Sequence, residues 1–97
     1  MILLHDIAAA ADRIARYVNH TPMIRSRTLS ERLGTNVSLK LELFQKTGSF
    51  KPRGAFNQLM SLGTAALARG VVGVSGGNFA QGLAFAAATL GVDAVIV

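Results

Sequence analysis

The sequence predicts an α/β fold built on a partial parallel sheet with flanking helices. Two short apolar runs, 71–74 and 94–97, are separated by an Ala-rich segment of helical length at 80–90. A strand, helix and strand in this order predict a parallel pair joined by a right-handed crossover. Polar and apolar residues alternate across 37–43, which predicts a further strand, and apolar residues recur at helical spacing across 7–18.

The first half of the chain is expected to contain two helices and one strand. Asp6 is the expected N-cap of the helix at 7–18, and Pro22 prevents that helix from continuing because it restricts the preceding residue to extended conformations. A short helix at 29–33 is expected to end at Gly34 in the left-handed conformation. The strand at 37–43 is expected to bury its leucine and valine face.

In the second half, Ser49 is expected to cap a helix at 50–62 that Gly63 closes. Pro52 is tolerated in its first turn, where amides have no intrahelical partner. The remaining elements are expected to be one more helical turn at 65–69, a buried strand at 71–74, a helix at 80–90 capped by Gly91, and a buried strand at 94–97.

The composition indicates an incomplete structural unit. A chain of 97 residues allows one small domain with a core near the lower limit of self-sufficiency. Its hydrophobic fraction of 51% is high and its charged fraction of 15% is low for a soluble domain. We therefore expect residues 1–97 to form a single incomplete segment, with apolar surface that further structure would cover.

Several classes of function are disfavoured by the same composition. The net charge of +5 is spread over residues 13–69 without a basic cluster, and only six aromatic residues accompany it, which argues against nucleic-acid binding. No apolar run reaches the roughly 20 residues of a membrane span. There is no cysteine, no signal-peptide pattern, and no carboxylate cluster near His5 or His20. We expect a cytoplasmic protein without a metal site or a membrane partner.

Lys51 is the first candidate for chemistry. A lysine at a helix start is ordinarily a solvated cation, slightly disfavoured by the positive end of the helix dipole. Arg53 crowds the same end, which favours the neutral amine, and only the neutral amine attacks an aldehyde.

The second candidate is the turn at 75–78, Ser-Gly-Gly-Asn, which follows a predicted strand and opens a predicted helix. Free amides and the helix dipole make such a turn an anion site, although a purely structural turn is the alternative. The glycine spacing fits neither a dinucleotide fingerprint nor a P-loop, in which a lysine would stand at Leu83. Ser49 and Lys51 are one residue too close for the Ser-x-x-Lys pattern of acyl-serine enzymes.

Taken in order, these segments resemble the threonine dehydratase and serine racemase family of pyridoxal phosphate (PLP) enzymes. The resemblance rests on Gly-Ser-Phe-Lys-Pro-Arg-Gly-Ala at 48–55 and Ser-Gly-Gly-Asn-Phe-Ala-Gln-Gly at 75–82, with His-Thr-Pro at 20–22 and Leu-Glu at 41–42 upstream. It extends from about Asp6 to Val97. It implies the N-terminal part of the fold type II (tryptophan synthase β-like) PLP enzyme fold.

The resemblance also implies roles for individual residues. Lys51 would form the Schiff base with pyridoxal 5'-phosphate and then remove the α-proton of the substrate. Phe50 would pack beside the cofactor ring, and Asn78 would hydrogen-bond its ring hydroxyl oxygen. The substrate carboxylate would bind at Ser75, Gly76, Gly77 and Asn78.

The implied activity is that of a threonine or serine ammonia-lyase, which converts a hydroxy amino acid to a 2-oxo acid and ammonia and is a homo-oligomer when complete. Gly76 stands where the racemases of the family carry serine, which favours elimination, and Phe79 stands where many relatives carry histidine. A β-replacing synthase, threonine synthase or serine racemase is the alternative within the fold, and a non-catalytic α/β interaction module is the alternative outside it. The family's phosphate-binding loop lies beyond residue 97, so we expect little or no activity from these residues alone.

Overall fold

The computed structural model describes residues 1–97 and confirms the α/β class. The parallel pair β3–β4 and the antiparallel pair β1–β2 form two separate two-stranded sheets. No helix is both long enough and apolar enough to cross a bilayer. In chain order the elements are α1 (Leu4–Ile14), β1 (Met23–Arg25), α2 (Arg27–Leu33), β2 (Ser38–Lys40), the 3₁₀ turns η1 (Glu42–Phe44) and η2 (Lys46–Gly48), α3 (Lys51–Ser61), α4 (Thr64–Leu67), β3 (Val71–Gly73), α5 (Asn78–Leu90) and β4 (Ala94–Ile96).

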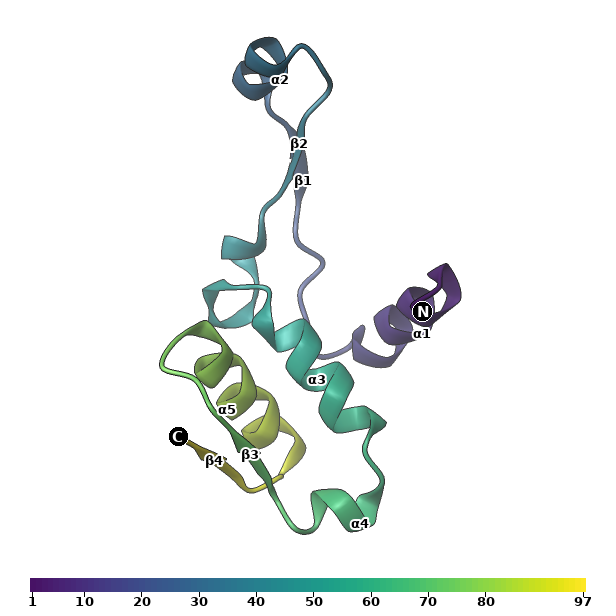
Figure 1. Cartoon of the computed structure of the whole chain (residues 1–97), viewed down its shortest axis with the longest axis vertical. Helices are drawn as coiled ribbons and strands as arrows, with labels where there is room; N and C mark the ends of the chain where they lie inside the picture. Colours follow the sequence, from purple (N-terminus) through teal and green to yellow (C-terminus); the bar gives the residue numbers. More distant parts are fainter.

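The molecule is elongated. Its radius of gyration is 16.0 Å, against about 12.5 Å for a compact chain of this length. Figure 1 shows the reason: β1 and β2 run out of the body as a thin arm that carries α2 at its tip. Only 14 of the 97 residues are buried, so the hydrophobic core is small and lies in the body.

The predicted parallel pair is present, with Val72 opposite Val95. The prediction that both strands are buried is wrong for one face of the sheet. Val72 and Val95 are 73% and 59% exposed, because α5 packs on the opposite face only. Successive side chains of a strand point to opposite faces, so one covering helix buries every second residue.

The prediction for the arm was less accurate. The expected strand at 37–43 is reduced to β2, and all three of its residues are exposed. It pairs with β1, which the sequence did not predict, and no other element packs on either face of the pair. The prediction of a buried leucine and valine face is therefore wrong. The strand is also shorter than expected, because η1 begins at Glu42.

Helix boundaries differ from the expected ones by a few residues. Leu3 is the N-cap of α1, and Asp6 lies inside the first turn, where its carboxylate accepts a hydrogen bond from the Leu3 amide at 2.8 Å. The helix ends at Ile14, four residues early. Gly63, with φ of −70°, precedes α4 and does not close α3. The left-handed C-caps at Gly34 and Gly91 are confirmed, with φ of 65° and 67°.

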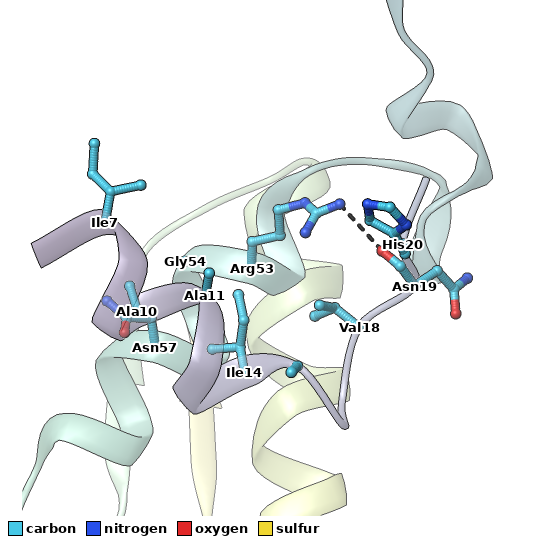
Figure 2. A pocket seen from close by; sticks show the side chains of 11 residues that line it. Ile7, Ala10, Ala11, Ile14, Val18, Asn19, His20, Arg53, Gly54 and Asn57 are labelled. Atoms are coloured by element: carbon cyan, nitrogen blue, oxygen red, sulfur yellow. Dashed lines mark hydrogen bonds between the residues drawn. The ribbon is translucent and has the colours of Figure 1, made fainter. Parts of the chain in front are cut away.

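The first helix, α1, lies beside α3 across an open cavity of about 590 Å³. Figure 2 shows apolar side chains of α1 on one wall of this cavity and Arg53, Gly54 and Asn57 of α3 on the other. The cavity is polar at the end where Asn19, His20 and Arg53 meet. It lies on the side of α3 that carries Arg53.

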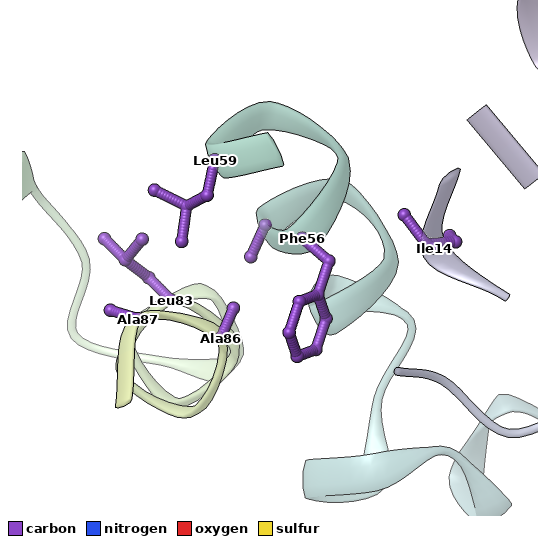
Figure 3. Close-up of a cluster of buried hydrophobic side chains, with 7 residues drawn as sticks. Ile14, Phe56, Leu59, Leu83, Ala86 and Ala87 are labelled. Carbon is purple, nitrogen blue, oxygen red and sulfur yellow. The ribbon is translucent and has the colours of Figure 1, made fainter. Parts of the chain in front are cut away.

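The hydrophobic core lies mainly between α3 and α5. Phe56 is fully buried; its ring stacks on Tyr17 at 4.9 Å between centroids and meets Phe85 edge-on at 5.9 Å. Figure 3 shows Phe56 and Leu59 of α3 facing Leu83, Ala86 and Ala87 of α5, with Ile14 on the side of α3 away from α5. The other buried hydrophobic residue is Ala55.

Two glycines allow α5 to pack this closely between its neighbours. At Gly73 an added Cβ would overlap the side chain of Leu83, so β3 can lie directly against α5. At Gly82 an added Cβ would lie 2.9 Å from the Cβ of Lys51 and 3.1 Å from the Pro52 nitrogen. The backbone of α5 therefore contacts the first turn of α3.

We expect Gly82→Ala to lower the free energy of unfolding by about 1–3 kcal/mol, because a methyl group there must push the two helices apart. This loss outweighs the gain of about 1 kcal/mol in helix propensity. Gly54→Ala is the matched control: Gly54 is also helical, with nothing within 4 Å of the added methyl, and should stabilise by about 0.5–1 kcal/mol. Urea denaturation followed by circular dichroism measures both; equal effects would contradict the close-packing interpretation.

Candidate functional site

Lys51 is the first residue of α3 and is half-buried. Its amide donates a long hydrogen bond of 3.4 Å to the Ser49 hydroxyl. Its Nζ lies 4.9 Å from the centroid of the Phe50 ring, which is itself 57% exposed. No hydrogen bond or ion pair engages this amine. The amine is thus available to a ligand, and an aromatic ring lies next to it.

The close approach at Gly82 places Lys51 against α5. Asn78 opens α5 and lies four residues before Gly82, so both are on the same face of the helix, one turn apart. The structure therefore brings Lys51 and Asn78 to neighbouring positions at one end of the α3–α5 interface. No hydrogen bond joins the two side chains, and the amide group of Asn78 is exposed and unpaired.

The turn between β3 and α5 presents several hydrogen-bond donors. The Ser75 hydroxyl accepts hydrogen bonds from the amides of Gly77 at 3.2 Å and Ala80 at 3.3 Å. Its own proton remains free to be donated. The amides of Gly76, Asn78 and Phe79 have no acceptor, and an added Cβ at Gly76 or Gly77 would meet nothing within 4 Å. Anions bind at such exposed amides at the positive end of a helix.

A third cluster joins three segments that are far apart in sequence. Arg53 donates from Nε to Glu42 at 2.8 Å and from Nη2 to the same carboxylate at 2.9 Å. The Thr21 hydroxyl donates to Glu42 as well, and Thr21 is only 3% exposed. We call Thr21, Glu42 and Arg53 the clamp.

Hydrogen bonds and charge in the clamp act on the Glu42 carboxyl. The hydrogen bond from Arg53, with a further one from Thr21, outweighs partial burial and lowers the pKa of Glu42 to about 2. The same pairing raises the pKa of Arg53. The sequence interpretation placed Arg53 at the same helix end as Lys51, and the structure adds that Glu42 balances the charge of Arg53.

Sequence reasoning assigned no role to the clamp. Glu42 and Arg53 are 11 residues apart and belong to no helical or strand repeat that would place them together. The only signal was that both residues occur in the segments that carry the family resemblance. Their pairing depends on how η1 folds back onto the start of α3.

Two cavities with mostly hydrophobic linings lie next to α3, and neither includes the lysine. The larger one, between α1 and α3, includes Arg53 but not Lys51 or Asn78. A smaller cavity of about 280 Å³ lies between α3, β3 and α5, and Phe79 is part of its wall. No group of three or more histidine, cysteine or acidic residues is arranged to hold a metal ion.

The residues around Lys51 fit a flat carbonyl cofactor that carries a ring hydroxyl. The donor set is a free primary amine, an unpaired side-chain amide on Asn78 and the exposed ring of Phe50. The turn at 75–78 adds free amides and a hydroxyl over which no side chain stands. A free amine close to a helix start with unpaired backbone amides is the combination expected of enzymes that bond a lysine to a carbonyl group.

The chain belongs to the family of pyridoxal-phosphate dependent enzymes, whose family model matches residues 14–97. It is 48% identical to an L-threo-3-hydroxyaspartate ammonia-lyase of Pseudomonas over 93 residues, which are 96% of this chain and 29% of that protein. It is 46% identical to the catabolic L-threonine dehydratase of Escherichia coli over 96 residues, which are 99% of this chain and 29% of the dehydratase.

A solved structure gives the same result for the fold. The serine racemase of Dictyostelium discoideum superposes with a TM-score of 0.89 at 40% identity, over 98% of this chain and 32% of the racemase. The fold type II PLP architecture expected from the resemblance is confirmed. The chain spans less than a third of the length of these relatives.

We expect the clamp to make the protein sensitive to acid. The folded pKa of Glu42 is about 2, below its ordinary 4.5, so its stabilisation is complete above pH 4.5 and is lost as the pH falls toward 2. Glu42→Gln should cost about 1–3 kcal/mol at neutral pH and remove this part of the acid dependence. Denaturation midpoints between pH 6 and 2 measure it.

The control for this experiment is Glu31→Gln, which breaks an exposed pair with Arg27 at 2.8 Å. Exposed pairs contribute at most about 1 kcal/mol, so this variant should keep the acid dependence of the parent. An identical acid dependence in Glu42→Gln and the parent would refute the role given to Glu42.

Proposed function

We propose that these 97 residues form the amino-terminal, lysine-bearing part of a PLP-dependent ammonia-lyase and have little or no activity alone. The observation that carries the proposal is that Lys51, whose amine is unpaired, is held by its Cβ and backbone against Gly82, one helical turn from Asn78, in a helix that opens with free amides. Family membership supports the cofactor. The homo-oligomeric state and cytoplasmic location expected from the sequence remain predictions.

Each site residue has a role that its surroundings support. Lys51 would hold the cofactor through Nζ and, once that amine is released and neutral, take the proton from the substrate α-carbon. Asn78 would orient the cofactor ring through its side-chain amide, and Phe50 would cover one side of it. When bound, PLP supplies an electron sink for the negative charge that develops at the α-carbon.

The Ser75–Asn78 turn is proposed to bind the substrate carboxylate. The Ser75 proton and the amides of Gly76 and Asn78 are free, whereas the Gly77 amide is already bonded to Ser75. A carboxylate here would lie at the positive end of the 13-residue helix α5. This arrangement would hold the substrate by a group common to all amino acids.

The substrate class is proposed to be β-hydroxy-α-amino acids such as threonine or serine. The names of the similar proteins include a hydroxyaspartate ammonia-lyase and a threonine dehydratase, which share that chemistry. Loss of the β-hydroxyl and hydrolysis of the resulting enamine yield a 2-oxo acid and ammonia. Gly76 offers no side chain that could deliver a proton to the α-carbon, which favours elimination over racemisation.

The test is a chimera in which this chain replaces the 96 residues that it matches in the E. coli dehydratase. We expect the chimera to bind PLP and release ammonia from threonine, and the isolated chain to release none. Lys51→Ala should abolish turnover and the cofactor absorbance that depends on the lysine. Lys46→Ala is the control, since the Lys46 amine lies 5.8 Å from the Phe85 ring centroid and has no proposed role.

A folded chimera without PLP absorbance would refute the proposal, as would full activity in Lys51→Ala. Circular dichroism of the chimera against the parent dehydratase separates these results from misfolding. Borohydride reduction followed by peptide mapping locates the cofactor on Lys51 or on another lysine.

In the same chimera we expect Ser75→Ala to raise KM for threonine about tenfold or more, equivalent to at least 1.4 kcal/mol. The variant loses the hydroxyl proton and leaves the amides of Gly77 and Ala80 unpaired. The control is Ser61→Ala, an exposed helix residue whose hydroxyl donates to the Asn57 carbonyl. Steady-state kinetics on threonine measures both, and an unchanged KM in Ser75→Ala would exclude a carboxylate site at Ser75.

A further inference from the structure

We propose that Arg53 and Glu42 are positioning residues that fix the orientation of the first turn of α3 and thereby the direction of the Lys51 amine. The importance of that direction rests on the proposed function, in which Lys51 must reach both cofactor and substrate. The contacts that orient the first turn of α3 lie entirely within this chain.

Arg53 and Lys51 lie on opposite sides of the same helical turn. Two residues along an α-helix correspond to a rotation of about 200°. Lys51 faces α5 at Gly82, and Arg53 faces the other two residues of the clamp, Thr21 and Glu42. Any rotation of α3 that moves Lys51 must therefore also move Arg53.

The contact on the Lys51 side fixes the separation of α3 and α5 more than it fixes the rotation of the first turn of α3. Gly82 has no side chain, and the start of α3 lies so close to it that an added Cβ would be 2.9 Å from the Lys51 Cβ. The first amides of a helix also have no intrahelical partner, and the Lys51 amide makes only one long bond to Ser49. The buried Pro52 packs on this side by shape alone, and no short hydrogen bond here orients the first turn.

The contact on the Arg53 side is directional. The guanidinium meets the Glu42 carboxylate with two hydrogen bonds of 2.8 and 2.9 Å, and such bidentate pairs fix orientation as well as distance. Nη2 also donates to the Asn19 carbonyl at 3.2 Å, as Figure 2 shows, and to the Thr21 hydroxyl at 3.3 Å.

The partners of Arg53 are themselves held in place. The buried side chain of Gln45 accepts from the Asn19 amide at 2.8 Å and donates to the Asn19 carbonyl at 2.9 Å. The Lys40 amine donates to the Thr21 carbonyl at 2.7 Å. Asn19 and Thr21 are therefore held in fixed positions. Arg53 bonds to both and to Glu42, and so fixes the orientation of the first turn of α3.

The experiment reads the position of the Lys51 amine directly in the 97-residue chain, without cofactor. Reductive methylation with ¹³C-formaldehyde labels each lysine and keeps its charge, and Lys→Arg variants assign the signals. The Lys51 methyl signal should be displaced by the Phe50 ring, which lies 4.9 Å from Nζ, and Phe50→Leu should remove that displacement. The Lys46 signal, displaced by Phe85, is an internal reference for the fold.

We expect Arg53→Lys and Glu42→Gln to remove more than half of the Lys51 displacement and to leave the Lys46 displacement unchanged. Arg53→Lys keeps the positive charge but cannot form the bidentate hydrogen bonds. Glu42→Gln keeps the side-chain shape but removes the negative charge. The matched controls are Arg27→Lys and Glu31→Gln in the exposed pair of α2, which should change neither signal.

Three results would overturn the proposal: an undisplaced Lys51 signal in the parent chain, a full displacement in both clamp variants, or a simultaneous loss of the Lys46 displacement. The last result would mean that the clamp maintains the whole fold and not the direction of one side chain. Because no cofactor or turnover is involved, failure of the PLP assignment would appear in the chimera experiment and leave this measurement intact.

Discussion

The close approach of α3 and α5 at Gly82 is the constraint on which the rest of the structure depends. Because that position lacks a side chain, the α5 backbone rests against Lys51 and Pro52. The same approach lets Phe56 and Leu59 meet Leu83, Ala86 and Ala87, which form most of the small core. The same contact therefore brings the two helices of the core together and holds the Lys51 backbone against α5.

The start of α3 is held from two sides by interactions of different kinds. On one side a glycine permits close but smooth contact, and on the other the clamp supplies short, charged and directional hydrogen bonds. Glu42 also balances the charge of Arg53, so the first turn of α3 carries an ion pair and not a second uncompensated cation. The ion pair thus joins the lysine-bearing helix to Glu42, a residue outside the lysine segment.

Much of the remaining surface is apolar and exposed. One face of β3–β4 carries Val72 and Val95 in the open, and the arm of β1, β2 and α2 makes few contacts with the body. The high hydrophobic fraction of the sequence thus corresponds, in part, to apolar surface that is exposed in the structure.

The sequence alone determined the family, the parallel β3–α5–β4 unit, the left-handed glycine caps and the identity of the candidate site residues, because each of these depends on local pattern or on contiguous motifs. It did not determine the pairing of β1 with β2, the exposed faces of both sheets, or the clamp. These depend on which segments meet in space: the alternation at 37–43 is the same whether or not anything covers it, and Glu42 reaches Arg53 only through the fold of η1. Tertiary structure decided them because burial and ion pairing are properties of neighbours that the linear order of residues does not specify.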